Sequence, residues 1–188
     1  MKWLTLYARS RQVPVSAVAV ALVALAVWVF DGPGPEDLAT AVLVLTASVA
    51  AASVGLGGPD VVLERTAAIR WLPRRAAHVL LIGVCAGAAL LTVQAAGAEL
   101  APSGVVVRDS AGLVGLAALG ATVFGAQFAW TLPTGWLAVT LVVPTPGGRV
   151  GEVVNWMIFP SDTTASGAVA WALLAAGTVV YAVAGPRR

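Results

Sequence analysis

Histidine and cysteine are the side chains most able to bind a metal, and this chain has one of each. His78 and Cys85 are seven residues apart, so they share one helix face across two turns. A structural zinc site takes about four ligands, and the sequence holds no second histidine or cysteine. We therefore expect both residues to pack inside a helix rather than to bind a metal.

The motifs of nucleotide hydrolysis and of the common hydrolases are also absent. There is no G-x-x-x-x-G-K-[ST] sequence, no nucleophile elbow and no zinc-binding H-E-x-x-H motif. The Pro-Gly-Gly-Arg run at 146–149 is typical of a turn. The sequence thus predicts no enzyme activity, no catalytic residue, no cofactor and no nucleic-acid partner for this chain.

The most polar stretch lies at residues 59–75, between two apolar runs, and holds four of the eleven basic residues. Asp60 is placed to cap a short helix and Pro73 to end it, which predicts a helix over Asp60–Leu72. A charged helix held against the membrane suits a partner protein, although an ordinary basic loop touching lipid headgroups has the same composition. The predicted docking residues are Asp60, Glu64, Arg65, Ile69, Arg70 and Trp71.

The composition places the chain in lipid. It is 59% hydrophobic and 11% charged, with a mean hydropathy of +0.90, whereas soluble domains carry about 25% charged residues. The apolar runs leave too few residues for a separate soluble domain, so we expect a single transmembrane domain over residues 1–188. The single cysteine excludes an intramolecular disulfide.

Six apolar runs divide the sequence into an all-α, polytopic membrane protein with about six transmembrane helices. A basic arm with Lys2, Arg9 and Arg11 precedes them and is expected to lie as an interfacial helix along the membrane. The predicted spans are Val13–Phe30, Leu38–Gly57, Ala76–Ala98, Ala111–Trp130, the short Thr134–Val143, and Ala165–Ala184.

The basic residues predict the orientation. With six crossings and a cytoplasmic N-terminus, nine of the eleven basic residues are cytoplasmic, and only Arg108 and Arg149 lie outside. If the fifth run only dips into the membrane, the number is eight, so six crossings with both termini cytoplasmic are preferred. No charged residue lies in the middle of a predicted span, which counts against a proton-coupled pump or a voltage-gated channel.

Two further patterns concern packing. Small residues along the fourth span let helix backbones approach, either within one subunit or at a dimer seam; they are Gly112, Ala117, Ala121 and Gly125. Helical periodicity over Arg149–Phe159 predicts a short extracellular helix, re-entrant or interfacial, between spans five and six. Its membrane-facing residues are Val150, Val153, Val154, Trp156, Met157 and Ile158, with Trp156 at the headgroups.

The order of these features resembles the transmembrane subunit of a type V ABC exporter. The likeness rests on the basic arm, two spans, a predicted cytoplasmic helix containing Leu63-Glu64-Arg65-Thr66, and four further spans. In that family the loop between spans two and three holds a coupling helix that docks on the ATPase, and a glutamate matching Glu64 engages it. The family also places re-entering helices between spans five and six, where Arg149–Phe159 falls.

The resemblance implies a permease in a bacterial plasma membrane, paired with itself or with a sister permease. ATP and Mg would be bound by a separate ATP-binding ABC subunit. The uncharged span interiors suggest a hydrophobic or amphipathic substrate. The alternative is a non-transporting membrane scaffold or accessory subunit that binds another cytoplasmic partner, and a small membrane enzyme is a third class.

Overall fold

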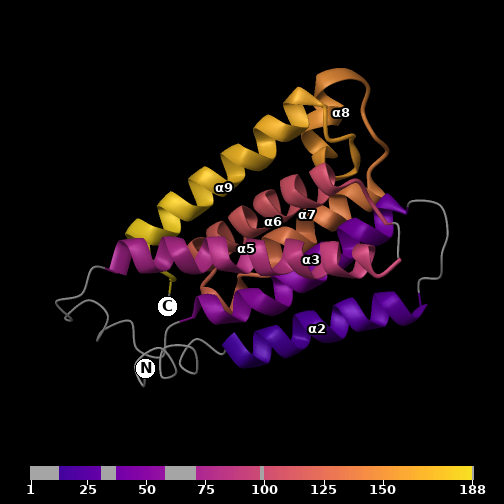
Figure 1. The fold of residues 1–188 in the computed structure, drawn as a ribbon. Helices are drawn as coiled ribbons and strands as arrows, with labels where there is room; N and C mark the ends of the chain where they lie inside the picture. Colours follow the sequence, from indigo (N-terminus) through magenta and orange to yellow (C-terminus); the bar gives the residue numbers. More distant parts are fainter. Residues whose placement is uncertain (1–12, 31–36, 58–70, 98–99, 188) are drawn as a thin grey trace.

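The computed structural model describes residues 13–30, 37–57, 71–97 and 100–187, and within these ranges the chain is helical without a strand. Figure 1 shows the arrangement of the helices. The elements are α2 (Val13–Phe30), α3 (Leu38–Ser53), η1 (Val54–Leu56), α5 (Trp71–Ala95), α6 (Ser103–Val123), η2 (Ala126–Phe128), α7 (Thr131–Val142), α8 (Gly148–Val154), η3 (Trp156–Ile158) and α9 (Thr164–Ala184).

Several of these helices are long and apolar enough to cross a membrane, which confirms the expected class of an all-helical membrane protein. In the described ranges they are Leu38–Leu56, Trp71–Ala95, Ser103–Val123 and Thr164–Ala184. Helix α2 has 18 residues, about 27 Å at 1.5 Å per residue. Helix α7 has 12, about 18 Å, which is short of a hydrocarbon core of about 30 Å.

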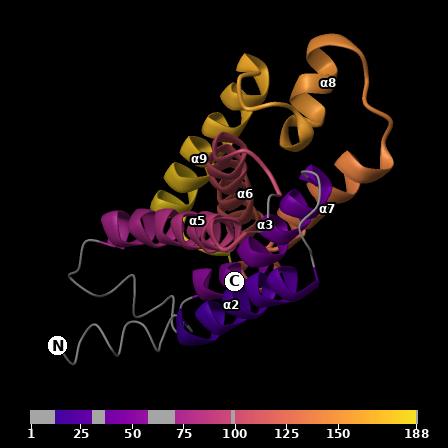
Figure 2. The same cartoon turned by 45° about the vertical axis from the view of Figure 1, so that its right-hand side comes forward.

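Consecutive helices from α2 to α7 run in alternating directions, and α9 runs back across them at an angle (Figure 1). Helices α3 and α6 occupy the middle, with α2 along one edge (Figure 2). Buried residues make up 78% of the apolar window of α6 but 22% of that of α9. Helix α6 is therefore the central packing element, and most of α9 faces outward.

The bundle has two ends, the η1 end and the α8 end. At the η1 end, η1 stops, α5 begins and α9 finishes; at the α8 end, α6 and α9 begin beside α8 and η3 (Figure 1). Residues 58–70 join η1 to α5 in the sequence. The predicted docking stretch is thus attached to the η1 end.

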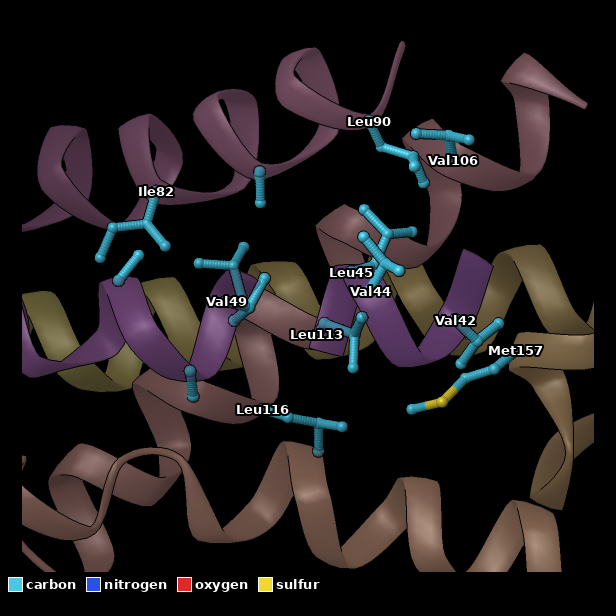
Figure 3. Packing of buried hydrophobic residues seen from close by; sticks show 14 of the residues in the cluster. Val42, Val44, Leu45, Val49, Ile82, Leu90, Val106, Leu113, Leu116 and Met157 are labelled. Atoms are coloured by element: carbon cyan, nitrogen blue, oxygen red, sulfur yellow. The ribbon is translucent and has the colours of Figure 1, made fainter. Parts of the chain in front are cut away.

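The core between α3, α5 and α6 is built mainly of branched aliphatic side chains and alanine. Figure 3 shows Leu45 and Val49 of α3 close to Leu113 and Leu116 of α6, while Met157 of η3 lies beside Val42. All of these side chains are at most 3% exposed. The α8–η3 segment therefore belongs to the core as well as to the end of the bundle.

The fourth span lies earlier in the sequence than predicted. The expected Ala111–Trp130 left Arg108 outside, whereas α6 covers Ser103–Val123 and so includes both Arg108 and Asp109. It ends because Gly125 has a φ of 100°, a conformation that favours glycine. The prediction treated two adjacent charges as a boundary, but opposite charges that pair are tolerated inside a helix.

The role predicted for Pro73 is wrong. It does not end a helix before the third span; α5 runs without a break from Trp71 to Ala95, with Pro73 in its first turn. The first N–H groups of a helix have no partner inside the helix, so a proline there loses no hydrogen bond. The third span therefore starts five residues before the predicted Ala76 and includes Arg74 and Arg75.

The predicted single helix over Arg149–Phe159 is broken in two. Helix α8 ends at Val154, Asn155 adopts a non-helical conformation, and the short η3 follows. Trp156 was expected at the headgroups, but its side chain is fully buried against Gly112 of α6. The backbone turn at Asn155 reorients the chain, so Trp156 points inward while Val150 and Val153 stay exposed.

Candidate functional site

Most of the predicted docking residues, Asp60, Glu64, Arg65, Ile69 and Arg70, lie outside the described residues. Trp71 is the exception: it begins α5 and is half-buried. The guanidinium carbon of Arg74 lies 5.9 Å from the centre of the Trp71 ring, within cation–π range. The described part of the stretch is therefore a basic, aromatic first turn of α5.

The helix ends that flank residues 58–70 are joined by hydrogen bonds. His78 Nε2 lies 3.0 Å from the carbonyl oxygen of Gly55, and the Tyr181 hydroxyl donates to the carbonyl of Leu56. Carbonyls at the end of a helix lack partners within it, so side chains from α5 and α9 supply them here. All four residues are buried, and η1, α5 and α9 are thereby held together.

The end of α9 is also tied to α5 and α6. The backbone N–H of Arg187 donates to the carbonyl of Ala121 at 3.0 Å, and its guanidinium Nη1 donates to that of Val123 at 3.1 Å. Gly185 has a φ of 73°, and a Cβ there would come within 2.8 Å of the Arg75 guanidinium carbon. The η1 end is thus one packed unit formed by four separate parts of the chain.

The small residues predicted for helix packing all lie inside the chain. Ala117 and Ala121 are fully buried in α6, and a Cβ on Gly125 would lie 3.2 Å from the carbonyl oxygen of Arg187. Gly112 receives the Trp156 indole, whose Cζ3 atom would lie 2.8 Å from an added Cβ. These positions are used for packing within this subunit.

At the opposite end, α6 carries a buried ion pair, Arg108–Asp109, which the apolar pattern of the sequence predicts to lie outside the membrane helices. Arg108 is 4% exposed and Asp109 is fully buried, and Arg108 Nε donates to Asp109 Oδ1 at 2.8 Å. The available signal was an adjacent Arg–Asp pair in an otherwise apolar run. A charged residue within a membrane helix is a functional-site hypothesis by default, because it is expensive to keep.

The rest of the Arg108 guanidinium satisfies the end of the α8–η3 segment. Its Nη1 donates to the carbonyls of Phe159 and Pro160, both at 2.9 Å, and its Nη2 to that of Met157 at 3.3 Å. Free carbonyls at the end of a broken membrane helix attract cations. Here the cation is the Arg108 side chain, which donates to these carbonyls, and Asp109 offsets its charge.

Two further side chains hold the same segment through its carbonyls. Trp136 Nε1 of α7 donates to Val154 at 2.8 Å, and Ser166 Oγ of α9 donates to Glu152 at 2.9 Å. Together with Arg108 they attach α8 and η3 to three helices. The segment is held by directed hydrogen bonds, so its position depends on where α6, α7 and α9 lie.

Beside this pair, several buried polar atoms have no hydrogen-bond partner among the described residues. They are Asp109 Oδ2, the side-chain oxygen and nitrogen of Asn155, and Trp156 Nε1. Gly112, one helical turn beyond Asp109, touches the Trp156 ring, so these groups gather where α6 meets η3. Buried polar atoms are nearly always satisfied, so these atoms are candidates to bind a water molecule or a polar ligand.

An apolar cavity of about 260 Å³ lies between α2, α3 and α5. His78 and Cys85 both line it, as do Val20 and Ile82. No group of three or more His, Cys, Asp or Glu side chains suited to a metal occurs in the described part of the chain. His78 and Cys85 therefore lie on the wall of an apolar space, near the η1 end.

The sequence matches no family model, and comparisons with curated proteins and with solved structures found no match.

Proposed function

We propose that this chain is the membrane-spanning permease subunit of an ATP-driven exporter. A separate ATP-binding ABC subunit holds ATP and Mg and docks on residues 59–75. The permease works as a homodimer or with a sister permease in a bacterial plasma membrane, with six crossings and both termini in the cytoplasm. The substrate is a hydrophobic or amphipathic molecule.

The observation that carries this proposal is the pair of hydrogen bonds at the η1 end, from His78 to Gly55 and from Tyr181 to Leu56. A partner that pushes on residues 58–70 acts on the last turn before them and the first turn after them. Gly55 and Leu56 of η1 are bonded to His78, in the second turn of α5, and to Tyr181 of α9, so the push moves η1, α5 and α9 as one body. A loop that only contacts lipid headgroups transmits no force, so it does not require these hydrogen bonds between the helices that flank it.

The second support comes from the α8 end. The α8–η3 segment is bonded to α6, α7 and α9 through the carbonyls of Glu152, Val154 and Met157, among others. A displacement of α9 at the η1 end therefore alters the hydrogen bonds that hold the α8–η3 segment at the other end of the bundle. This gives a mechanical route from a cytoplasmic push to an opening on the outer side, and it requires no chemistry by this chain.

The test is Glu64→Lys in the full chain, purified from membranes of the native host. We expect normal insertion, loss of the co-purifying ATPase and loss of transport, because a reversed charge on a docking helix opposes the partner's surface. Asp162→Lys is the matched control: it makes the same charge change at an exposed residue of the α8 end. It should keep the ATPase.

The outcomes separate the two main readings. A Glu64→Lys complex with unchanged stimulated ATPase activity contradicts the exporter. A cytoplasmic partner that depends on Glu64 but lacks an ATP-binding sequence supports the alternative, a scaffold or accessory subunit.

A further inference from the structure

Two adjoining hollows near the α8 end form one groove on the side of the bundle. The first, of about 490 Å³, lies between the starts of α6 and α9, and the second, of about 370 Å³, lies between α5, α6 and α9. Val107 and Trp171 line both. The two hollows therefore adjoin at Val107 and Trp171 and follow one another from the end of the bundle along the gap between α5 and α9.

The end part of the groove is lined by hydrogen-bond donors. Ser103 and Ser161 bear hydroxyl groups, and Arg108, which is 4% exposed, also lines this part. The four hydrogen bonds of Arg108 use four of its five N–H groups, which leaves one N–H without a partner among these bonds. The groove also meets the first turn of the 21-residue α6, where backbone N–H groups lack helical partners.

The rest of the groove is apolar and opens sideways. Its wall is made by Leu80, Val84 and Ala88 of α5 together with Val114 of α6 and Leu174 of α9. Val84 is 66% exposed and Trp171 52% exposed, so this part of the groove faces the surroundings of the bundle. Because α5, α6 and α9 are membrane-length helices, those surroundings are lipid chains.

We infer that this groove binds a phospholipid, with the phosphate group against Ser103, Ser161 and Arg108 and an acyl chain between α5 and α9. The donors at one end of the groove suit a ligand with acceptor oxygens. The apolar part suits a hydrocarbon chain attached to the group that carries those oxygens. A phospholipid has both in that order and is present on the open side of the groove. The inference does not depend on an ATPase partner.

The test uses native mass spectrometry of the purified full chain with phosphatidylglycerol and with diacylglycerol of the same chains. We expect about tenfold greater retention of phosphatidylglycerol, because hydrogen bonds to a charged phosphate are the added interaction. Two variants address the two ends. Ala88→Trp narrows the apolar part from an exposed position of α5, and Ser103→Ala with Ser161→Ala removes both hydroxyls.

Each variant should lower phosphatidylglycerol retention about fivefold or more. Ala138→Trp, which adds the same bulk at an exposed position of α7, should leave it unchanged. Equal retention of the two lipids, or equal effects of Ala88→Trp and Ala138→Trp, would mean non-specific surrounding lipid and overturn the inference. Displacement of lipid by inorganic phosphate, with no effect of Ala88→Trp, would assign the site to a free anion and also overturn it.

Discussion

Gly115 of α6 and Gly177 of α9 touch through their backbones: a Cβ added to Gly177 would overlap the carbonyl oxygen of Gly115. A Cβ on Gly115 would in turn overlap the carbonyl of Leu173, which also lies in α9. In lipid the association of helices depends on close packing, because the surrounding chains are as apolar as the side chains. This crossing fixes the angle of α9 and therefore the positions of both ends of the bundle.

Gly177→Ala should destabilise the chain because its new methyl group has no space. The expected loss is about 1–3 kcal/mol, as for overpacked cores, and it should appear as a lower Tm in detergent. Gly135→Ala is the matched control, since Gly135 lies in α7 with no atom within 4 Å of the added Cβ. That variant should be neutral or more stable by about 0.5–1 kcal/mol. Equal Tm values for the two variants would contradict the packing described.

Arg108→Met should be among the most damaging single changes. It leaves Asp109 as a buried charge without its partner and three carbonyls without a donor, at an expected cost of about 3–5 kcal/mol. Asp109→Asn keeps a side-chain oxygen at the same place and should cost less. Arg108→Lys should not rescue fully, because one ammonium does not span four acceptors.

The measurement for this pair combines Tm with limited proteolysis of the segment between α7 and α9. Release of that segment at temperatures where the wild-type chain is intact is the expected result for Arg108→Met. A wild-type Tm and cleavage pattern in Arg108→Met would show that the pair does not hold the segment.

Asp37 should make helix α3 sensitive to acid. Its side chain accepts from the hydroxyl and N–H of Thr40 and from the N–H of Ala39, and chiefly the Thr40 hydroxyl lowers its pKa below the ordinary 3.8. A lowered pKa means a stabilisation that is present above about pH 4 and is lost as the pH falls through the folded-state pKa.

At pH 7 Asp37→Ala should lower stability by about 0.5–2 kcal/mol, the usual worth of an N-cap. Asp37→Asn should keep most of the cap at pH 7, because asparagine also caps helices, and should lose the acid dependence of this group. The Tm difference between wild type and Asp37→Ala, measured at pH 7 and again near pH 2.5, tests this. A difference that does not shrink in acid would contradict the assigned cap.

His78→Ala should separate docking of the ATPase from transmission of its movement. The variant keeps residues 58–70 intact but removes the link between α5 and the carbonyl of Gly55. We expect the ATPase to co-purify within about twofold of wild type and transport to fall about tenfold or more, because the variant loses the hydrogen bond that links α5 to η1. Cys85→Ala, a change at an exposed neighbour in the same cavity wall, is the control. Normal transport by His78→Ala would contradict the proposed route.

The helices whose apolar runs end at polar or turn residues were predicted closely. The first run, Val13–Phe30, matches α2, and the last, Ala165–Ala184, differs from α9 by one residue. Asp31 and Gly185 follow these runs directly, and a change from apolar to turn-forming sequence is the strongest local signal of a membrane helix end. The orientation with six crossings stays a prediction.

The errors occurred where tertiary contacts change the meaning of a residue. Arg108 and Asp109 looked like the boundary of a membrane helix. The carbonyls that accept from Arg108 lie some fifty residues further along the chain, so the sequence does not show that this charge is satisfied inside the bundle. Trp156 looked interfacial, because nothing local shows that Gly112 leaves space for its ring. Periodicity also predicts one helix over Arg149–Phe159, whereas the structure breaks it at Asn155.

Photo-crosslinking from position 69 tests the central claim most directly. A photoreactive residue replaces Ile69 in the full chain, expressed in the native host, and Asp162 at the α8 end carries the same group as a control. The account predicts one main adduct from position 69, with a protein that contains a G-x-x-x-x-G-K-[ST] sequence, lost in the Glu64→Lys background and never formed from position 162. Labelling of position 69 by a membrane-impermeant reagent from outside the cell, or adducts that include no ATP-binding protein, would contradict it.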